Sequence, residues 1–205
     1  MVTSDDSIQS PYSRAAAWEL LTQWTLGESL RKHALGVEAC VVAYGEAEAD
    51  RIGLEGRHRA DLLTLYSTTA LLHDFDYERH PSLEEHPFVG VRELERLGWP
   101  EAMRTAILGH ATYSGVGRET HLAKTLFACD ELSGFLTACT LVKPSKAIAD
   151  VEVAGVRKKL KDKAFARGVN REDVIQSAQE LGVELDAHIA FCLKAMQLRA
   201  GELGL

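Results

Sequence analysis

The sequence of 205 residues lacks the motifs that identify several common classes of protein. Its four cysteines form no CxxC pair, so we expect reduced thiols in the core rather than disulfides or a zinc ribbon. It has no GxSxG elbow and no GxxxxGK[ST] loop, which disfavours covalent serine hydrolysis and P-loop chemistry. It also has no secretory signal pattern and no apolar run long enough to cross a bilayer. We therefore expect a cytoplasmic protein without a membrane partner.

Positive charge is scarce relative to negative charge. Lys and Arg number 23 against 30 Asp and Glu, which gives a net charge of −7. Proteins that bind nucleic acids neutralise phosphates with a basic surface, so we expect no stable nucleic-acid binding. The charge balance still allows a small phosphorylated ligand that is held by a local cluster of cations.

Alternating strand patterns are missing, whereas helical spacing of apolar residues runs through almost the whole chain. Proline, glycine and a candidate N-cap at Asn170 mark the ends of the helical segments. We therefore predict an all-α fold with these helices: 14–25, 28–49, 57–73, 88–97, 100–111, 119–140, 171–181 and 185–200. The length fits one domain at 13–205, preceded by a loose tail at 1–12.

The most informative segment is TTALLHDFDYERHP at 68–81. Three apolar residues lead directly into His73 and Asp74, on a helix that already buries leucines. Removing an adjacent histidine and aspartate from water costs free energy unless a partner compensates for the lost hydration. The segment therefore predicts a compensating partner in the interior.

Polar residues also lie on the apolar faces of other predicted helices. The residues in phase with apolar neighbours in this way are His33, His73, His110 and Asp130. A single histidine at such a place is more often a hydrogen-bonded core residue, and Asp130 could pair with Arg104 or Arg118. Four such residues on separate helices, with Asp74 beside one of them, favour a divalent cation. One cation would compensate several ligands at once for their lost hydration. Imidazole and carboxylate ligands suit manganese, iron, cobalt, zinc or nickel rather than calcium.

The ordered set His33, His73-Asp74 and Asp130 resembles the H…HD…D signature of the HD superfamily of metal-dependent phosphohydrolases. The segment EHPFVG at 85–90 looks like the HxxxG segment that follows HD in the two-metal branches, and ILGHATYSG at 107–115 would supply His110. The resemblance covers about residues 28–140 and implies an HD-domain helical bundle. Residues 141–205 would form a C-terminal helical extension.

Carried onto this sequence, the resemblance implies these ligands of a first metal: His33, His73, Asp74 and Asp130. Where two metals bind, Asp74 would bridge to a second ion held by His86 and His110. The implied activity is hydrolysis of a phosphate ester, of a nucleotide or another small phosphorylated metabolite, by metal-activated water. Asp74 would orient or deprotonate that water. Asp76 would position a histidine ring or protonate the leaving group.

This chain departs from the superfamily patterns at positions that distinguish branches with different substrates. The cyclic-dinucleotide branch has a second histidine where this chain has Ala111, a lysine where it has Tyr77, and a Gly-Tyr-Pro signature that is absent here. We therefore do not expect hydrolysis of cyclic di-GMP. The nucleoside-monophosphatase branch has a glutamate at the position of Tyr77, and Asp76 or Glu78 could supply that carboxylate. Two further functions stay open, a di-iron oxygenase of the same superfamily and a non-catalytic regulatory module that binds a nucleotide.

Three cations are candidates for binding the substrate phosphate: Arg118, Lys143 and Lys146. A solvated loop is the alternative interpretation of each. The basic stretch 157–167 would be a solvated helix face, or a contact to phosphate or to a second copy in a homodimer. We expect the other histidines to lie in exposed segments without metal: His58, His80, His121 and His188.

Overall fold

The computed structural model describes residues 12–205, and every regular element in this range is helical. The predicted all-α fold is therefore confirmed, while the predicted tail at 1–12 lies almost wholly outside the described residues. The α-helices are α1 (Arg14–Trp24), α2 (Glu28–Arg51), α3 (Gly56–Leu72), α4 (Phe88–Arg96), α5 (Glu101–His110), α6 (His121–Leu141), α7 (Val153–Leu160), α8 (Arg171–Leu181), α9 (Leu185–Leu198) and α10 (Ala200–Leu203). Two short 3-10 turns, η1 (Thr112–Ser114) and η2 (Ile148–Asp150), follow α5 and α6.

Side-chain caps define several helix starts. Ser13, Thr120 and Asn170 each accept a hydrogen bond from a backbone amide of the following first turn, which satisfies a donor that the helix itself leaves free. Gly182 ends α8 with φ of 78°, a left-handed conformation that favours glycine. The predicted helices agree with the observed bounds to within two residues. The basic stretch, in contrast, is helical only through the end of α7 and continues in turns.

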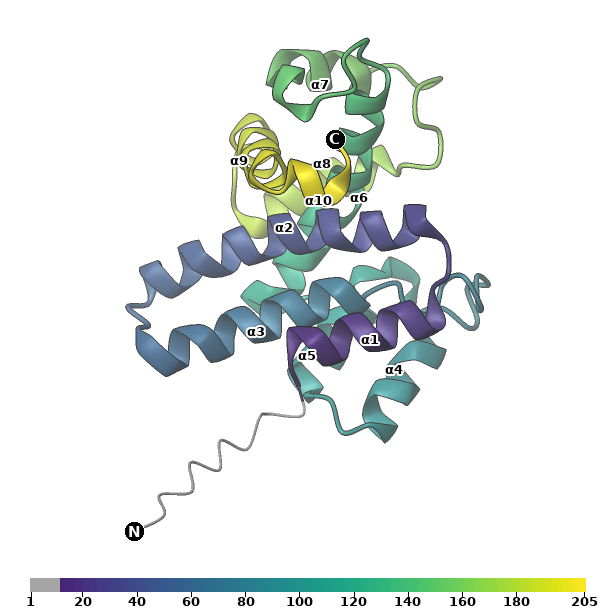
Figure 1. Ribbon diagram of the computed structural model, residues 1–205, viewed down its shortest axis with the longest axis vertical. Coiled ribbons are helices and arrows are strands. Elements are labelled where there is room, and N and C mark those ends of the chain that lie inside the picture. Colours follow the sequence, from purple (N-terminus) through teal and green to yellow (C-terminus); the bar gives the residue numbers. More distant parts are fainter. Residues whose placement is uncertain (1–11) are drawn as a thin grey trace.

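The central helix α6 packs against helices from both parts of the chain. It contacts α2 and α5 from the first part, and α8 and α9 from the extension. Figure 1 shows α1, α3, α4 and α5 together in the lower half of the molecule and α7 to α10 in the upper half, with α2 between them. A residue on α6 can therefore face either half.

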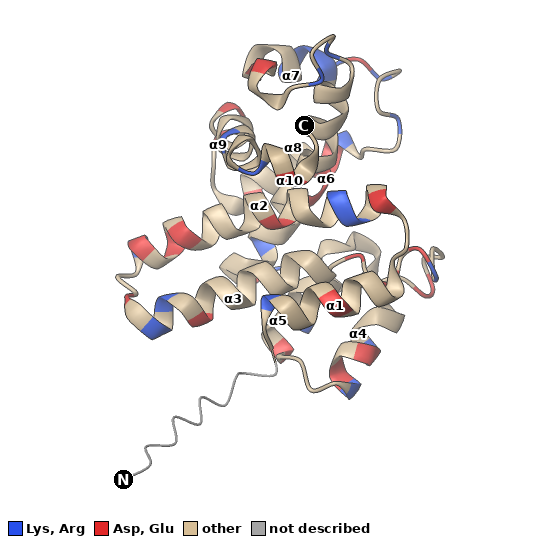
Figure 2. Ribbon diagram, in the orientation of Figure 1, with Lys and Arg blue, Asp and Glu red and all other residues tan. Residues whose placement is uncertain are grey.

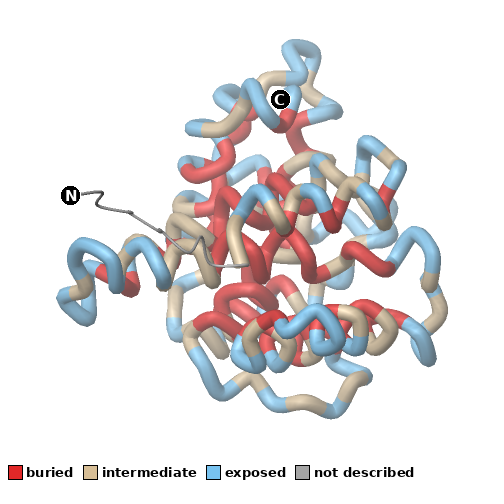
Figure 3. The backbone as a smooth tube through the Cα atoms, turned by 60° about the horizontal axis from the view of Figure 1, so that its bottom comes forward, coloured by how far each residue is buried: buried red, intermediate tan, exposed pale blue. Residues whose placement is uncertain are grey.

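One cluster of buried apolar side chains connects the two parts. It includes Leu71 and Leu126 from the first part and Val174 and Met196 from the extension. The buried segments gather in the middle of the molecule and the exposed segments surround them (Figure 3). All four cysteines are buried and unpaired, which confirms the prediction of reduced core thiols. The extension 141–205 thus shares its core with the helices that carry the predicted ligands.

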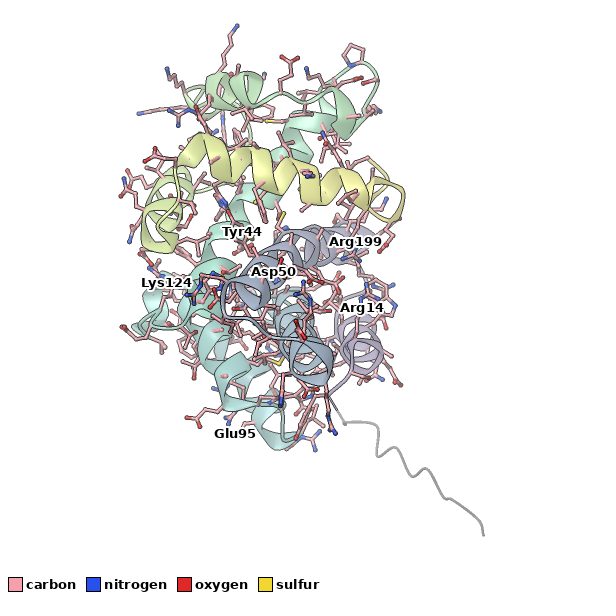
Figure 4. All side chains as sticks on the ribbon, turned by 90° about the vertical axis from the view of Figure 1, so that its left-hand side faces the viewer. Arg14, Tyr44, Asp50, Glu95, Lys124 and Arg199 are labelled. Carbon is pink, nitrogen blue, oxygen red and sulfur yellow. The ribbon has the colours of Figure 1, made fainter. Side chains whose placement is uncertain are left out.

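A buried ion-pair network ties the ends of the chain to α2. The side chain of Glu38 is 2% exposed, and Arg14 donates to its carboxylate at 2.6 and 2.9 Å. Arg199 lies 2.9 Å from the same carboxylate, and Ser67 donates to it from α3. Burial alone would raise the pKa of Glu38, but these donors outweigh it and lower that pKa. Figure 4 shows Arg14 and Arg199 on the same side of the molecule. The two guanidinium groups thus compensate the buried charge of Glu38.

The last turn of α7 carries three consecutive basic residues, Arg157, Lys158 and Lys159. Figure 2 shows this group of Lys and Arg at the upper end of the molecule. None of the helices in the described range is long and apolar enough to cross a membrane.

Candidate metal centre

The six predicted ligands come from five places in the chain and meet in one cluster. Their positions are His33 in α2, His73 and Asp74 directly after α3, His86 just before α4, His110 at the end of α5 and Asp130 in the middle of α6. Helix phase explains the inward direction of His33, His110 and Asp130, because each lies on the buried stripe of its helix.

The first group of potential ligands consists of His33, His73, Asp74 and Asp130, whose ligand atoms all lie within 4.8 Å of one another. Asp130 Oδ1 lies 3.0 Å from His33 Nε2 and 3.3 Å from His73 Nε2. Asp74 Oδ2 lies 3.5 Å from His73 Nε2 and 3.9 Å from His33 Nε2. Ligands bound at about 2.0–2.2 Å to one transition metal are separated by about 3–3.5 Å, so this group is close to the size that a shared ion requires.

The second group consists of Asp74, His86 and His110. Asp74 Oδ1 lies 3.3 Å from His86 Nε2 and 3.2 Å from His110 Nε2. The two oxygens of Asp74 therefore face different groups, Oδ2 the first and Oδ1 the second. A carboxylate placed in this way can bridge two ions at the ~3.5–4 Å separation of two-metal sites.

Backbone carbonyls fix the tautomer of two imidazoles. His73 Nδ1 lies 2.8 Å from the carbonyl oxygen of Ala70, and His110 Nδ1 contacts the carbonyl oxygen of Ile107. A carbonyl oxygen can only accept, so both Nδ1 atoms carry the proton in these contacts. Nε2 is then the ring atom of each imidazole that faces Asp74, and in the neutral imidazole it carries the lone pair with which histidines bind metal ions.

Asp76 positions a third imidazole. It is completely buried, and its Oδ1 lies 2.8 Å from His86 Nδ1. Its Oδ2 accepts a hydrogen bond of 2.7 Å from the backbone amide of Gly90. A Cβ at Gly90 would come within 2.9 Å of this carboxylate, so the close approach requires glycine. Of the two predicted roles of Asp76, these contacts fit the positioning of a histidine ring.

His73 Nε2 is an orphaned polar atom. The side chain is completely buried, and Nε2 has no hydrogen-bond partner. A buried acceptor without a partner costs about 1–3 kcal/mol. Here the cost is greater because the lone pair faces the carboxylate oxygens of Asp74 and Asp130. A cation between these atoms would remove the repulsion, so the residues present fit a bound metal ion.

The pKa values of the cluster show the sign of its electrostatic potential. Burial alone would raise the pKa of Asp74, but the surrounding imidazoles outweigh it and hold that pKa well below its ordinary value. Burial would lower the pKa of His86, yet Asp74 and Asp76 raise it to about 9. The pKa of His73 is raised well above its usual range by Asp74 and Asp130, again against burial. The carboxylates thus create a negative potential that attracts either protons or a metal cation.

The cluster opens into a cavity of about 420 Å³, which we call the central cavity. Its lining also includes Tyr77, Tyr113 and Val169. The hydroxyl of Tyr113 donates to the carbonyl oxygen of His86 at 3.0 Å, and the ring of Tyr77 packs edge-on against the imidazole of His86 with ring centroids 5.3 Å apart. Two aromatic side chains of the cavity lining thus contact one of the ligands.

Two further acids line the central cavity, Glu131 from α6 and Asp173 from α8. Burial and the neighbouring Asp130 raise the pKa of Glu131 to about 7. Neither acid was predicted, nor was Tyr113. The sequence offered two signals: Glu131 directly follows Asp130, and Tyr113 lies in the segment that carries His110. No sequence signal pointed to Asp173, because only the packing of α8 on α6 brings it to the cavity.

The three predicted phosphate-binding cations are not brought to the site. Arg118 donates to Glu180 at 2.7 and 2.8 Å and to the carbonyl oxygen of Gly109 at 2.8 Å, so its guanidinium is already satisfied. Lys143 and Lys146 follow the end of α6. At 1.5 Å per residue, Lys143 lies about 20 Å from Asp130 along the helix. None of the three lines the cavity beside the ligand cluster, and their contact to a substrate phosphate stays a prediction.

The prediction that His188 lies on an exposed surface is wrong. Its side chain is completely buried, with Nε2 donating to the carbonyl oxygen of Ala128 at 2.9 Å and Nδ1 accepting from the hydroxyl of Tyr44 at 2.7 Å. His188 shares a buried stripe with Cys192 and Met196 at four-residue spacing, which the charged residues nearby obscured. The other three histidines outside the cluster belong to neither ligand group and retain solvent exposure: His58, His80 and His121.

Comparisons with family models, with curated proteins and with solved structures gave no match to this chain. The case for a metal centre therefore depends on the cluster itself. Its support is the two groups of ligand atoms that share Asp74, together with the unsatisfied Nε2 of His73.

Proposed function

We propose that this protein is a metal-dependent phosphohydrolase of the HD type, which cleaves a phosphate ester of a small metabolite. The observation that carries the proposal is the position of Asp74, whose two oxygens face two separate groups of potential ligands. The order of these residues along the chain is also the order that resembles the HD signature. Support for the proposal thus comes from geometry and from sequence order together.

The ligand sets indicate where metal ions would be held. His33, His73, Asp74 and Asp130 would hold one divalent ion, and Asp74 with His86 and His110 a second. Such ions supply an acidified water molecule and positive charge against a non-bridging phosphate oxygen.

Side chains of this chain would organise the reactants around the ligands. Asp74 is 24% exposed toward the cavity, so beside the ions it would orient a water molecule there. Asp76 has no exposed surface, and both of its oxygens already accept hydrogen bonds, so it would act by holding His86 in place. Tyr77 and Tyr113 would exclude water from one side of the substrate.

The test is a metal analysis followed by assays of phosphate release. The purified protein is demetallated with a chelator, its metal loss is verified by mass spectrometry, and it is reconstituted with manganese, iron, cobalt, zinc or nickel. Substrates are aryl phosphates, sugar phosphates, nucleotides and cyclic nucleotides. We expect phosphate release to vanish on demetallation and to return with at least one metal. Hydrolysis that persists after verified metal loss contradicts the proposal.

The same preparations distinguish the other functions that the sequence left open. Oxygen consumption by the iron-loaded protein without phosphate release would indicate a di-iron oxygenase. Binding of a nucleotide without turnover of any ester would indicate a regulatory module.

A further inference from the structure

A second, more apolar cavity lies beside the central cavity. Its volume is about 230 Å³, and we call it the annex. His33 and Gly134 line both cavities, so the annex begins at a ligand of the candidate metal centre. The annex is also lined by Thr137 and by three leucines: Leu141, Leu203 and Leu205.

Gly134 lines both cavities and has no side chain that could separate them. Gly134 lies on α6 one turn after Asp130, and a Cβ built there would lie 3.8 Å from His33 Nδ1. That separation is an ordinary van der Waals contact, so an alanine would fit without displacing the imidazole. A longer side chain would extend into the space between the cavities and divide them.

Cations are few in the annex. Among residues 12–205, Lys32 is the only Lys or Arg in its lining, and the ammonium group of Lys32 lies 2.9 Å from a carboxylate oxygen of Glu28. The three leucines contribute apolar surface to this lining. An uncharged apolar group would release water from this lining when it enters, which favours binding in proportion to the area covered.

The charges of the central cavity limit the rest of the substrate. Within the described part of the chain its lining contains no Lys or Arg, whereas Asp74, Asp130, Glu131 and Asp173 all contribute carboxylates. Two divalent ions would balance the charge of one phosphate group and of the ligands. The additional negative charges of a nucleoside di- or triphosphate would face acids without a compensating cation.

We propose that the substrate is an ester of a single phosphate group with an apolar alcohol, whose phosphate lies at the Asp74 cluster and whose apolar group lies in the annex. This inference rests on the proposed phosphohydrolase function. In the reaction, the oxygen of water forms a bond to phosphorus and the ester P–O bond breaks. The ester oxygen leaves with its electron pair and takes one proton of the water, so the products are inorganic phosphate and the alcohol.

A chain-length series tests the annex. The substrates are methyl, butyl and hexyl phosphate, assayed with the metal-loaded full chain. Each buried methylene should raise kcat/KM roughly three- to fourfold until the annex is full. Methyl- and hexylphosphonate, which are not hydrolysed, provide a second readout by calorimetry, and hexylphosphonate should bind more tightly by a comparable factor.

Two variants locate the effect. Gly134→Leu should divide the cavities and lower the ratio of hexyl to methyl kcat/KM at least tenfold. Leu141→Asn changes a half-exposed side chain at the edge of the annex, so it should fold and lower the same ratio by a smaller factor. The matched control is Gly155→Leu, an exposed glycine in α7 with no atom within 4 Å of its Cβ position, which should leave the ratio unchanged.

The failure of this inference is distinguishable from the failure of the proposed function. Equal kcat/KM for methyl and hexyl phosphate, or an unchanged ratio in Gly134→Leu, overturns the annex inference and leaves the phosphohydrolase intact. Absence of hydrolysis of every ester overturns the function. In that case equal affinity for the two phosphonates overturns the annex as well.

Discussion

His73 and His188 are both completely buried imidazoles, but their surroundings differ in the way that separates a ligand from a core residue. His188 uses both ring nitrogens, one as donor to Ala128 and one as acceptor from Tyr44. His73 uses only Nδ1, and its Nε2 faces two carboxylates without a hydrogen bond. A buried histidine alone is therefore weak evidence of a metal site, whereas a buried and unsatisfied nitrogen beside carboxylates is stronger evidence.

The pKa values of these two histidines differ in the same direction. Burial lowers the pKa of His188, which keeps this imidazole neutral inside the core. His73 experiences the same loss of hydration, yet Asp74 and Asp130 raise its pKa well above the usual range. One region excludes positive charge and the other attracts it.

Replacing the shared carboxylate should remove function completely. In Asp74→Ala both ligand groups lose an oxygen, so we expect little bound metal and phosphate-ester hydrolysis below detection. Manganese should raise the melting temperature of the original protein, because it binds only the folded state, and should not raise that of the variant. Mass spectrometry and thermal unfolding measure these effects. The control is Asp173→Ala, which removes an acid of the same cavity that belongs to neither ligand group. Full metal content in Asp74→Ala would disprove the assignment.

The second largest effect should appear in the other region and should concern stability alone. His188→Ala leaves a cavity and deprives Ala128 and Tyr44 of their partners. We expect a loss of about 2–4 kcal/mol in the free energy of unfolding, measured with denaturant. Metal content of the folded variant should be unchanged. A folded variant that has lost its metal would mean that the two regions are not independent.

A smaller effect should follow from loosening one ligand. Asp76→Asn removes the charge that orients His86, and changes of this kind cost about 10–100-fold in metal affinity. Because His86 belongs only to the second group, a competition titration with a chelator should show weakening of one metal equivalent and not of the other. Equal weakening of both equivalents would contradict the division into two groups.

The smallest effect should come from a methyl group beside the cluster. Gly134→Ala places a Cβ at ordinary contact distance from His33 and removes a glycine from the interior of α6. Glycine costs about 0.5–1 kcal/mol relative to alanine within a helix, so the variant should be more stable by up to that amount. Its metal content should match that of the original protein. Loss of stability would mean that the helix relies on the space at Gly134.

Most of the ligand set could be predicted because helix phase carries direct information about burial. His33, His110 and Asp130 stand on stripes of apolar residues, and an inward-facing acid or imidazole needs a partner whichever helix it meets. Helix phase also points His188 inward, through its four-residue spacing to Cys192 and Met196, but charged residues nearby on the helix mask this signal in the sequence.

The local sequence determined the helices, their caps and the inward direction of His33, His110 and Asp130, because hydrogen bonding and side-chain period act over a few residues. Distances between helices depend on how their surfaces pack, and that is a property of the whole fold. Only the tertiary structure therefore directed the two oxygens of Asp74 to different groups and paired Arg118 with Glu180. The packing of α8 on α6 brought Asp173 to the cavity, and the length of α6 separated Lys143 from it.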